Sequence, residues 1–429
     1  MLDIRFLREN PKLVKESEKK RGHLTNYVDE ILELDEKWRK TTKQVEELKH
    51  KRNIVSLEIN ELKKNKKDAA KKIKEMQDVA KKINKLDDQA NEQLKSRDAL
   101  LIKVGNIIHK SVPKGKDESK NKVIRKWGKP TKLSFPPKTH VELMENLGIG
   151  DFETSAKTTG NGFYFLKREL ALLNQALIQF AIEFMHKKGY TYIEPPLMLR
   201  KEVLAASTDT VTLFNSIYNI DGEDLSLIGT SEYSMLAMHM NETIPEDQLP
   251  KKYFSYTMCF RKEIGAHGIN EKGLWRTHQF NKVEQFIFCK PEDSYKYYEE
   301  LSKNTEEMFK KLKLPHRINE MCEGDLALWK AKSSDIEVYR PTTKQYEELG
   351  SLTNCTDYQA RKLNIKVLNK KGERVILHTL NNTALATSRA MVTILENYQQ
   401  KDGSIKVPTV LQKYMFNIKK IGGAKNSRR

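Results

Sequence analysis

Charged side chains of both signs are crowded into residues 259–280, CFRKEIGAHGINEKGLWRTHQF, around a loop that holds three glycines. Arg261, Glu263 and Arg276 lie within this segment, and Glu284 follows it closely. Exposed ion pairs contribute only about 0–1 kcal/mol to the free energy of folding, so stability alone does not explain such crowding. A site for a ligand that is both anionic and polar could use every one of these groups.

The same segment is predicted to form two strands, residues 252–263 and 277–288, joined by a glycine-containing loop. Side chains two positions apart share one face of a strand, so Arg261 and Glu263 are expected to point the same way. On the second strand, one face carries Thr277 and Gln279 and the other carries Phe280, Lys282 and Glu284. Arginine can bind a phosphate or carboxylate through two N–H groups, and a carboxylate can accept the amino group of a base. The hairpin therefore indicates a binding face with both kinds of group.

Several classes of protein and site are disfavoured by the composition of the 429 residues, which are 38% hydrophobic and 31% charged. No segment approaches the roughly 18 apolar residues of a membrane-spanning helix, and MLDIRFLREN lacks the apolar centre of a signal peptide. No GxxxxGK[ST] or GxGxxG is present, which argues against a P-loop or Rossmann nucleotide site. The four cysteines form no CxxC pair, which indicates reduced thiols in the cytoplasm without zinc or disulfides.

The net charge of +19 is concentrated in the first third of the chain. Residues 1–130 hold 35 Lys and Arg against 22 Asp and Glu, a surplus of 13 that leaves only +6 for the rest. Such a basic segment is typical of a protein that meets a polyanion such as nucleic acid. A lysine-rich solvated surface with no partner would give the same count, so the charge alone leaves both interpretations open.

A heptad pattern between residues 31 and 108 predicts two helices that pack as an antiparallel coiled coil. The first series of apolar positions ends at Leu62, and a second begins at Ala69 and extends to Ile108. The segment between them, KKNKKD, has no apolar residue and is predicted to be a turn. The predicted tip, residues 61–75, carries seven lysines against three acids, so the arm could reach along a nucleic acid. A coiled coil that only dimerises the protein is the alternative.

The remaining chain is predicted to form an α+β domain built on an antiparallel sheet, because strand-like and helix-like runs alternate with hairpin signals. Residues 111–135 mix proline, glycine, serine and charge, and are interpreted as a linker between residues 1–110 and a catalytic domain at 136–418. The last residues, 419–429, contain five basic residues and no acid, and are expected to form a flexible tail.

An ordered set of motifs resembles the class II aminoacyl-tRNA synthetases, in the form found in seryl-tRNA synthetases. FRKE followed by RTHQFNKVE resembles motif 2 of that class, and the helical arm resembles the tRNA-binding arm of the family. The other matches are MLDIRFLRENPKLV at the N-terminus, GYTYIEPPLM (motif 1), LIGTSE (the TxE loop), YEELGSLTNCTDYQAR (the magnesium and ATP segment) and LNNTALATSRAMVTILENYQ (motif 3). Thr387 and Ser388 stand where bacterial members have glycines, as in archaeal and eukaryotic members. Trp275 departs from the smaller residues common at its position.

The resemblance implies an ATP site that contains Mg²⁺. Arg261 would be catalytic, holding the substrate carboxylate and the ATP α-phosphate. Glu263 would accept the adenine amino group, Phe280 and Arg389 would enclose the base, and Glu348 and Ser351 would bind the metal. The full set implied for ATP is Arg261, Lys262, Glu263, Thr277, Phe280, Glu348, Leu349, Gly350, Ser351 and Arg389.

The resemblance also implies that the chain activates L-serine and transfers it to tRNA(Ser). Thr230 and Glu232 would receive the substrate ammonium group, and Glu284 and Thr383 would read its hydroxyl group; Ser231 and Arg261 would complete the serine-binding set. Alanine would leave buried Glu284 without its hydrogen-bond donor, which predicts strong rejection. Taken singly, each of these residues could equally be a helix cap, a rim ion pair or a surface group.

Further implications concern partners. The arm would grip the long variable arm of tRNA(Ser), motif 1 would lie at a homodimer interface, and tRNA(Sec) remains open as a second substrate. Two alternatives are a catalytically inactive paralogue that only binds tRNA and a ligase that charges a carrier protein. The intact Arg261, Glu263, Glu348 and Arg389 argue against the first, and the long arm argues against the second.

Overall fold

The computed structural model describes residues 2–207, 214–263 and 272–422. The chain divides into two compact units, residues 1–107 and 108–429. Most of the predicted glycine loop and the end of the predicted tail lie outside the described residues. Among the helices that are described, none combines the length and apolar composition that crossing a bilayer requires.

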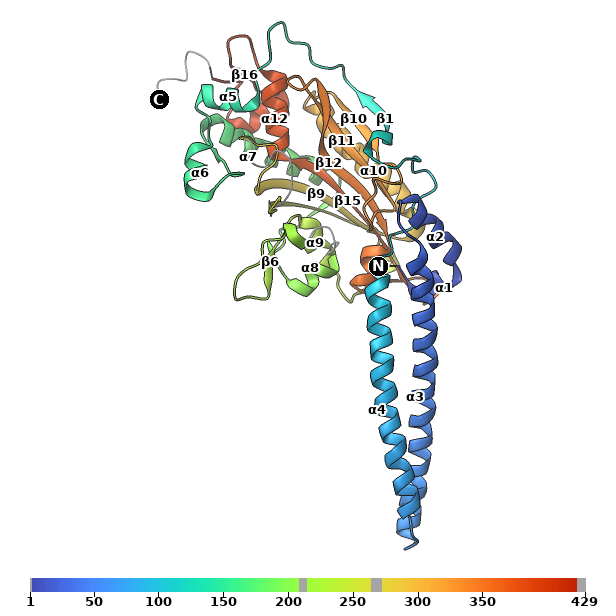
Figure 1. Cartoon of the computed structure of the whole chain (residues 1–429). Helices are drawn as coiled ribbons and strands as arrows, with labels where there is room; N and C mark the ends of the chain where they lie inside the picture. Colours follow the sequence, from blue (N-terminus) through green and yellow to red (C-terminus); the bar gives the residue numbers. More distant parts are fainter. Residues whose placement is uncertain (1, 208–213, 264–271, 423–429) are drawn as a thin grey trace. The chain divides into compact units, whose positions relative to one another are not determined.

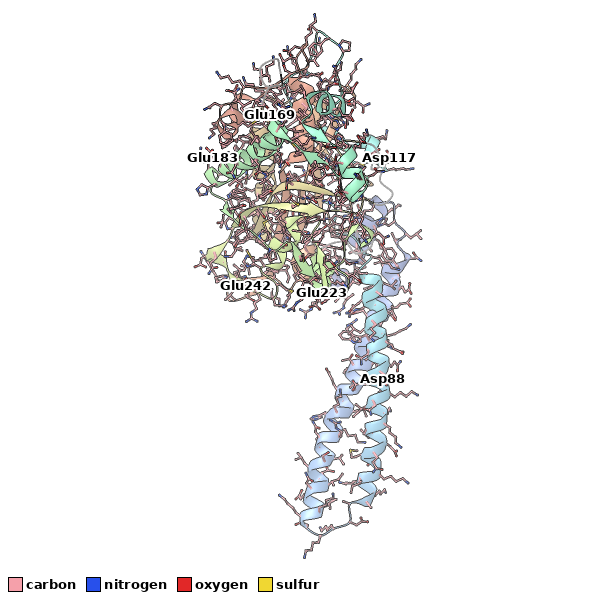
Figure 2. The ribbon with its side chains drawn as sticks, turned by 90° about the vertical axis from the view of Figure 1, so that its left-hand side faces the viewer. Asp88, Asp117, Glu169, Glu183, Glu223 and Glu242 are labelled. Atoms are coloured by element: carbon pink, nitrogen blue, oxygen red, sulfur yellow. The ribbon has the colours of Figure 1, made fainter. Side chains whose placement is uncertain are left out.

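The N-terminal unit contains a long pair of helices. Its described helices are α1 (Ile4–Glu9), α2 (Pro11–Lys20), α3 (Asn26–Lys64) and α4 (Ala70–Leu101). Helices α3 and α4 run side by side, and the 39 residues of α3 give an arm roughly 58 Å long (Figure 1). Their shared seam buries Val45, Ile59, Met76, Val79 and Ile83. Charged side chains such as Asp88 project away from it into solvent (Figure 2). The predicted antiparallel arm is therefore confirmed.

The end of the second arm helix differs from the prediction, because α4 stops at Leu101 although the apolar series continues to Ile108. Several residues after Leu101 are buried outside a helix, among them Val104 and Ile108. The N–H of Gly105 donates to the buried carboxylate of Glu18, at 2.9 Å. A continuing helix would have used that N–H internally, so a tertiary hydrogen bond that heptad spacing cannot reveal ends the helix.

The second unit is built on an eight-stranded sheet in the order β1-β10-β11-β12-β15-β9-β8-β4. Its strands are β1 (Lys122–Trp127), β4 (Thr191–Tyr192), β8 (Lys251–Phe260), β9 (Gln279–Cys289), β10 (His316–Glu320), β11 (Lys332–Arg340), β12 (Gln345–Thr356) and β15 (His378–Ala386). All neighbouring pairs are antiparallel except β4 and β8. The predicted α+β class with an antiparallel sheet is therefore confirmed.

Helices and short strands surround this sheet. The helices are α5 (His140–Leu147), α6 (Glu153–Thr159), α7 (Arg168–Lys187), α8 (Lys201–Ser207), α9 (Ser231–Ala237), α10 (Ser294–Lys311), α11 (Tyr358–Lys362), α12 (Thr387–Tyr398) and α13 (Thr409–Gln412). The short strands are β2 (Gly150–Asp151) with β3 (Phe165–Leu166), β5 (Met198–Arg200) with β6 (Leu225–Leu227), β7 (Thr243–Pro245) with β13 (Lys366–Leu368) and β14 (Arg374–Ile376), and β16 (Ile405–Lys406) with β17 (Lys420–Ile421).

Two predicted connecting segments contain strands. The proposed linker 111–135 includes β1, which pairs with β10 at the edge of the main sheet. Its side chains alternate between exposed and half-buried, so the strand lacks the strong apolar signal of a central strand. The proposed tail beginning at 419 likewise starts with β17, which pairs with β16. Both corrections concern short edge strands, whose polar composition resembles that of a loop.

The two faces of the central strands have different partners, which explains where a site can form. On β9, Gln285 points to one face and donates from Nε2 to Leu301 and Thr305 of α10. Asn382 on β15 reaches the same two residues. Because neighbouring side chains alternate, Glu284 points to the opposite face of the sheet. Helix α10 therefore covers one face and leaves the other available for a ligand.

Candidate active site

A cavity of about 360 Å³ lies over the free face of the central strands. The described residues that line it are Ser216, Ile217, Gly229, Thr230, Glu232, Tyr233, Phe260, Arg261, Glu263, Trp275, Arg276, Thr277, Phe280, Lys282, Glu284, Trp329, Lys330, Glu348, Leu349, Gly350, Ser351, Thr353, Asn381, Thr383, Ala386, Ser388 and Arg389. They come from distant parts of the sequence, on β8, β9, β12, β15, α9, α12 and the connections between them. Every predicted site residue except Lys262 and Ser231 lines this one cavity.

The β8–β9 hairpin supplies the guanidinium and the ring at the centre of the cavity. Strand β8 ends at Phe260, opposite Gln279, and the N–H of Arg261 donates to the carbonyl of His278 at 2.9 Å. The Arg261 guanidinium lies 5.3 Å from the Phe280 ring centroid and donates from Nε to the carbonyl of Gly229 at 3.2 Å. These contacts hold the positive charge in a defined position over the sheet.

The prediction that Glu263 shares a strand face with Arg261 is wrong, although both side chains line the cavity. Glu263 is not part of the strand, and its φ of 50° lies in the left-handed region that few residues other than glycine adopt. Its carboxylate accepts from Nη1 of Arg276 at 2.8 Å, an ion pair across the two limbs of the hairpin. The turn at Glu263, rather than strand alternation, directs its side chain into the site.

A second arginine stands at the other side of the cavity, at the start of α12. Nη1 of Arg389 donates to the carbonyl of Glu348 at 2.8 Å and to its carboxylate at 3.1 Å. Desolvation would raise the pKa of Glu348, but the charge and hydrogen bond of Arg389 outweigh it and lower the pKa. Glu348 is therefore an anion in this site.

The residues at this side of the cavity fit a magnesium ion bound with phosphate. Glu348 offers a carboxylate and Ser351 a hydroxyl, which are the hard oxygen ligands that Mg²⁺ prefers. Directly across the strand pair from Ser351 lies Asp335, whose Oδ1 is buried without a hydrogen-bond partner. No group of three or more His, Cys, Asp or Glu among the described residues could hold a metal by itself. A cation at this place would therefore depend on ligand oxygens.

The end of the cavity over β9 and the start of α9 is lined by two carboxylates, Glu284 and Glu232, and by Lys282. Glu284 is only 1% exposed and pairs with Nζ of Lys282 at 2.8 Å. The same ammonium group donates to Oγ1 of Thr230 at 2.6 Å. Thr383 faces Glu284 across β15 and β9 and donates from Oγ1 to its Oε2 at 3.3 Å. This end of the cavity can accept hydrogen bonds from a small cationic and polar ligand.

Glu232, at the start of α9, is held by two amide groups. Its Oε1 accepts from Nε2 of Gln359 at 2.6 Å and from Nδ2 of Asn381 at 3.0 Å. Burial, followed by the nearby charge of Glu284, raises the pKa of Glu232 to about 7. A cation bound beside these carboxylates would relieve that repulsion and favour the ionised form. The site is thus suited to an ammonium group.

Two predicted residues stand outside the cavity lining. The side-chain oxygen of Ser231 is buried and has no hydrogen-bond partner, while the N–H of Lys262 donates to the carbonyl of Ser216 at 2.9 Å. Thr277 lines the cavity, but its hydroxyl donates to the carbonyl of Gln279 at 3.0 Å. His278 from the opening segment fixes the hairpin, because its Nδ1 lies 2.9 Å from the carbonyl of Arg261.

Sequence reasoning missed several polar residues of the site. Strand alternation placed Lys282 on the face of Phe280 and Glu284, but gave it no role in the site. No local signal could have identified Gln359 on α11, or Lys330, whose Nζ lies 3.5 Å from Oγ of Ser351. Their roles follow from contacts between segments that are far apart in the sequence.

The antiparallel sheet, the β8–β9 hairpin and the cavity with its three arginines define a class II aminoacyl-tRNA synthetase core. Residues 215–398 match the family described as the tRNA synthetase class II core domain (G, H, P, S and T). Residues 1–108 match the seryl-tRNA synthetase N-terminal domain. The serine–tRNA ligase of Methanoregula boonei is 44% identical over 97% of this chain and 99% of its own length. That of Pyrococcus furiosus is 43% identical over 96% of each chain.

The solved structures agree. Seryl-tRNA synthetase from Pyrococcus horikoshii, complexed with ATP, is 41% identical and superimposes with a TM-score of 0.92 over 99% of this chain and 100% of its own. The cytoplasmic serine–tRNA ligase of Naegleria fowleri, in complex with AMP, is 34% identical with a TM-score of 0.87, covering 98% of each chain. The chain belongs to the seryl-tRNA synthetase family. The family that the ordered motifs predicted is therefore confirmed.

Proposed function

We propose that the cavity binds ATP and L-serine side by side, forms seryl-adenylate, and transfers the seryl group to the 3′ end of tRNA(Ser). This is the activity of a serine–tRNA ligase, an ATP-dependent enzyme. The observation that carries the proposal is the polarity of the cavity. Carboxylates that suit an ammonium and a hydroxyl group line it from β9 and α9, and arginines that suit carboxylate and phosphate line it from the β8–β9 hairpin and α12.

The amino acid would bind over β9 and β15. Its ammonium group would lie against Glu232 and Thr230, and its hydroxyl group would donate to Glu284 beside Thr383. The existing Lys282–Glu284 pair supports this arrangement, because it shows that the Glu284 carboxylate accepts a donor from within the cavity. Glu284 already accepts from Lys282 and Thr383, so a serine hydroxyl would be a further donor, whereas the methyl group of alanine would make no hydrogen bond beside this buried charge, which favours serine over alanine.

Adenylate formation needs no nucleophile from the protein. One carboxylate oxygen of serine attacks the α-phosphorus of ATP, the new O–P bond forms, and the bond to pyrophosphate breaks. Arg261 would hold both the attacking carboxylate and the α-phosphate, where negative charge accumulates in the transition state. Preorganised charge of this kind is supported by its contacts to Phe280 and Gly229.

The adenosine and the remaining phosphates would occupy the Glu263 and Arg389 sides of the cavity. The adenine would lie between the Phe280 ring and the Arg389 guanidinium, with its amino group donating to Glu263. Glu348 and Ser351 would hold Mg²⁺, which neutralises phosphate charge when it is bound. Lys262, Thr277, Leu349 and Gly350 would complete the ATP site, and Ser231 the serine site.

The partner proposals concern the whole protein. The N-terminal unit would bind the long variable arm of tRNA(Ser) through the lysines of its tip, and tRNA(Sec) is a candidate second substrate. The enzyme would act as a homodimer that pairs through motif 1. A cytoplasmic location is supported by the Naegleria fowleri relative, which is named a cytoplasmic ligase.

Amino-acid-dependent exchange between ATP and pyrophosphate, measured with each of the twenty amino acids and no tRNA, tests this proposal. Exchange with serine alone is expected. Exchange with alanine or glycine would contradict the assignment of Glu284 and Thr383 while leaving the ligase class intact. No exchange with any amino acid would favour the inactive tRNA-binding paralogue, which nothing in the cavity lining supports.

A further inference from the structure

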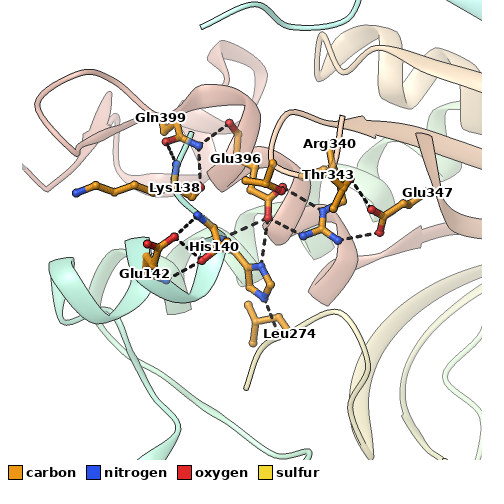
Figure 3. A network of polar contacts seen from close by, with 12 residues as sticks. Lys138, His140, Glu142, Leu274, Arg340, Thr343, Glu347, Glu396 and Gln399 are labelled. Carbon is orange, nitrogen blue, oxygen red and sulfur yellow. Dashed lines mark hydrogen bonds and ion pairs between the residues drawn. The ribbon is translucent and has the colours of Figure 1, made fainter. Parts of the chain in front are cut away.

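A buried carboxylate on α12 stands at the centre of a polar cluster outside the cavity (Figure 3). Glu396 is fully buried and accepts from Nε and Nη2 of Arg340 at 3.0 and 2.7 Å. It also accepts from the hydroxyl of Thr342 at 2.6 Å and contacts Nδ1 of His140 at 3.3 Å. Desolvation would raise the pKa of Glu396, but its hydrogen bonds to His140, Arg340 and Thr342 lower it to about 2. Glu396 is therefore ionised at neutral pH.

Stability alone is a weak reason for this cluster. Replacing a buried ion pair by well-packed apolar residues is often neutral or stabilising. Glu396 lies seven residues after Arg389 on α12, two helical turns away on the same face, about 10 Å along the axis. The cluster therefore lies two helical turns from Arg389, the residue proposed to bind ATP, on the same face of α12.

Two of the three partners of Glu396, His140 and Arg340, reach the second limb of the β8–β9 hairpin loop. Nε2 of His140 accepts the N–H of Leu274 at 3.2 Å, as Figure 3 shows, so its proton lies on Nδ1, facing Glu396. The guanidinium of Arg340 lies 4.6 Å from the Trp275 ring centroid. Gly273 has a φ of 151°, and a Cβ there would lie 2.6 Å from Nε2 of His140. Contacts with His140 and Arg340 thus fix the position of segment 273–275.

Trp275 in turn contacts Arg389. The Arg389 guanidinium lies 5.4 Å from the Trp275 ring centroid, and its Nε donates to the Trp275 carbonyl at 3.4 Å. Guanidinium groups within about 6 Å of an indole face are attracted by its ring electrons. Arg389 is therefore held by Trp275 on one side and by Glu348 on the other, and Trp275 itself lines the cavity.

We infer that Trp275 is a positioning residue for ATP binding, held by the Glu396–Arg340–His140 cluster and acting through the guanidinium of Arg389. The inference rests on the proposed role of Arg389. Trp275 supplies a ring face and a carbonyl that keep Arg389 in its place before ATP arrives. The indole of Trp275, which is larger than the side chains common at its position in the family, thereby has a structural role in this chain.

The test measures the dissociation constant (Kd) of ATP by calorimetry on the full chain, together with the KM values for ATP and serine in the exchange reaction. Trp275→Leu is expected to weaken ATP binding about 3- to 30-fold, the range of a cation–π contact, and to leave the KM for serine unchanged. Trp275→Phe keeps a ring and is expected to restore most of the affinity. A uniform rise of both KM values would indicate general distortion and would overturn the inference.

A double-mutant cycle separates this role from the proposed function. In an Arg389→Ala background, Trp275→Leu is expected to have no further effect on the Kd of ATP, because its partner is already gone. Equal weakening in both backgrounds would show that Trp275 acts independently of Arg389. Serine-dependent exchange by the unchanged protein tests the proposed function separately, so the two can fail independently.

Two further variants guard against failure to fold. Arg340→Lys keeps a positive charge beside Glu396 but removes the flat guanidinium from Trp275, and is expected to weaken ATP binding in the same selective way. Trp127→Leu is the matched control, because it removes an indole of edge strand β1 that stacks on His316 at 5.5 Å. It should leave the Kd of ATP unchanged. An effect of Trp127→Leu equal to that of Trp275→Leu would contradict the inference.

Discussion

Thr383 lies directly opposite Glu284 across strands β15 and β9, and its hydroxyl oxygen is 3.3 Å from the Glu284 carboxylate. The pairing places the Glu284 carboxylate, a hydrogen-bond acceptor, beside the Thr383 hydroxyl in a buried part of the cavity. The sheet register, rather than any loop, therefore sets the geometry in which a serine hydroxyl would be read.

Glu284→Gln is expected to reduce kcat/KM for serine about 100-fold, because a hydrogen bond to a charged acceptor is worth roughly 1.5–3 kcal/mol and Lys282 loses its partner. The KM for ATP should change little. Thr383→Val, which keeps the shape and removes the hydroxyl, should have a smaller effect of the same kind. The exchange reaction measures kcat and the KM values for serine and ATP. An equal loss of kcat/KM for ATP and for serine would exclude a specific role in reading serine.

The raised pKa of Glu232 predicts that serine binding depends on pH. Burial and the charge of Glu284 raise this pKa to about 7, so the carboxyl group is largely protonated at lower pH and cannot pair with an ammonium. The KM for serine is expected to rise about tenfold from pH 8 to pH 6, with no matching change for ATP. Glu232→Gln should abolish the dependence.

The raised pKa of Glu232 also predicts how the stability of the ligand-free protein depends on pH: stability falls as pH rises, whereas serine binding improves. Because the folded pKa exceeds the ordinary value of 4.5, Glu232 contributes stability below pH 4.5 and loses it as the pH rises through about 7. Saturating serine should reduce that loss by supplying a positive charge. The free energy of unfolding measured with and without serine over this pH range checks the sign, and a Glu232 contribution that grows with pH would contradict it.

Local patterns predicted the parts of the molecule whose signals are repeated or sharply spaced. Heptads located α3 and α4 because each apolar position is repeated many times along the arm. Alternation on β9 placed Phe280 and Glu284 on one face, and the structure finds both in the cavity. The ordered motifs gave the family, since each restricts the segments around it.

The remaining features depend on contacts that no local pattern records. Gln359 reaches Glu232 from α11 and lies 127 positions away in the sequence. Strand β1 has no buried apolar face, so its mixed composition resembled a linker. Glu263 enters the cavity through a left-handed turn instead of strand alternation. The Arg340–Glu396 pair likewise joins β11 to α12.

We predict that position 350 requires glycine, because any side chain there would clash with Thr383. A Cβ at Gly350 would lie 2.7 Å from Cβ of Thr383, so Gly350→Ala should displace the threonine. We expect the KM for serine to rise about tenfold and the free energy of unfolding to fall by about 1–3 kcal/mol, as for other overpacked sites. Gln345→Ala, at an exposed position of the same strand, is the control. Wild-type serine binding by Gly350→Ala would contradict the close packing.

Asp35 at the base of the arm is predicted to affect tRNA charging without affecting adenylate formation. It is 1% exposed and accepts from Arg8 at 2.6 Å, Arg97 at 3.0 Å and Arg39 at 3.1 Å. Asp35→Ala would remove the acceptor shared by the three arginines; Arg97 keeps Asp98 at 2.7 Å and Arg8 and Arg39 reach solvent, so the expected cost is about 1–3 kcal/mol. Aminoacylation should fall while serine-dependent exchange is retained, because the cavity lies in the other unit. Loss of exchange would show that the two units are energetically coupled.

The basic tip of the arm is predicted to bind tRNA through phosphate contacts. Lys63, Lys64 and Lys67 are exposed around the turn between α3 and α4. Changing all three to alanine should weaken tRNA binding and reduce the slope of log affinity against log salt by up to about 3, since each phosphate contact contributes about 0.7–0.9. Lys66 is left unchanged because its φ of 54° makes that position conformationally sensitive.

The matched control is a triple alanine variant of exposed lysines in the second unit, Lys303, Lys311 and Lys406. It removes the same charge, so a general loss of electrostatic attraction would weaken tRNA binding equally in both variants. A larger loss and a larger change of salt slope in the tip variant would indicate direct contact. Serine-dependent ATP–pyrophosphate exchange should be unchanged in both, because that reaction requires no tRNA. Equal tRNA affinity and equal salt slopes in the two variants would mean that the arm tip makes no phosphate contacts, leaving its length to serve another partner.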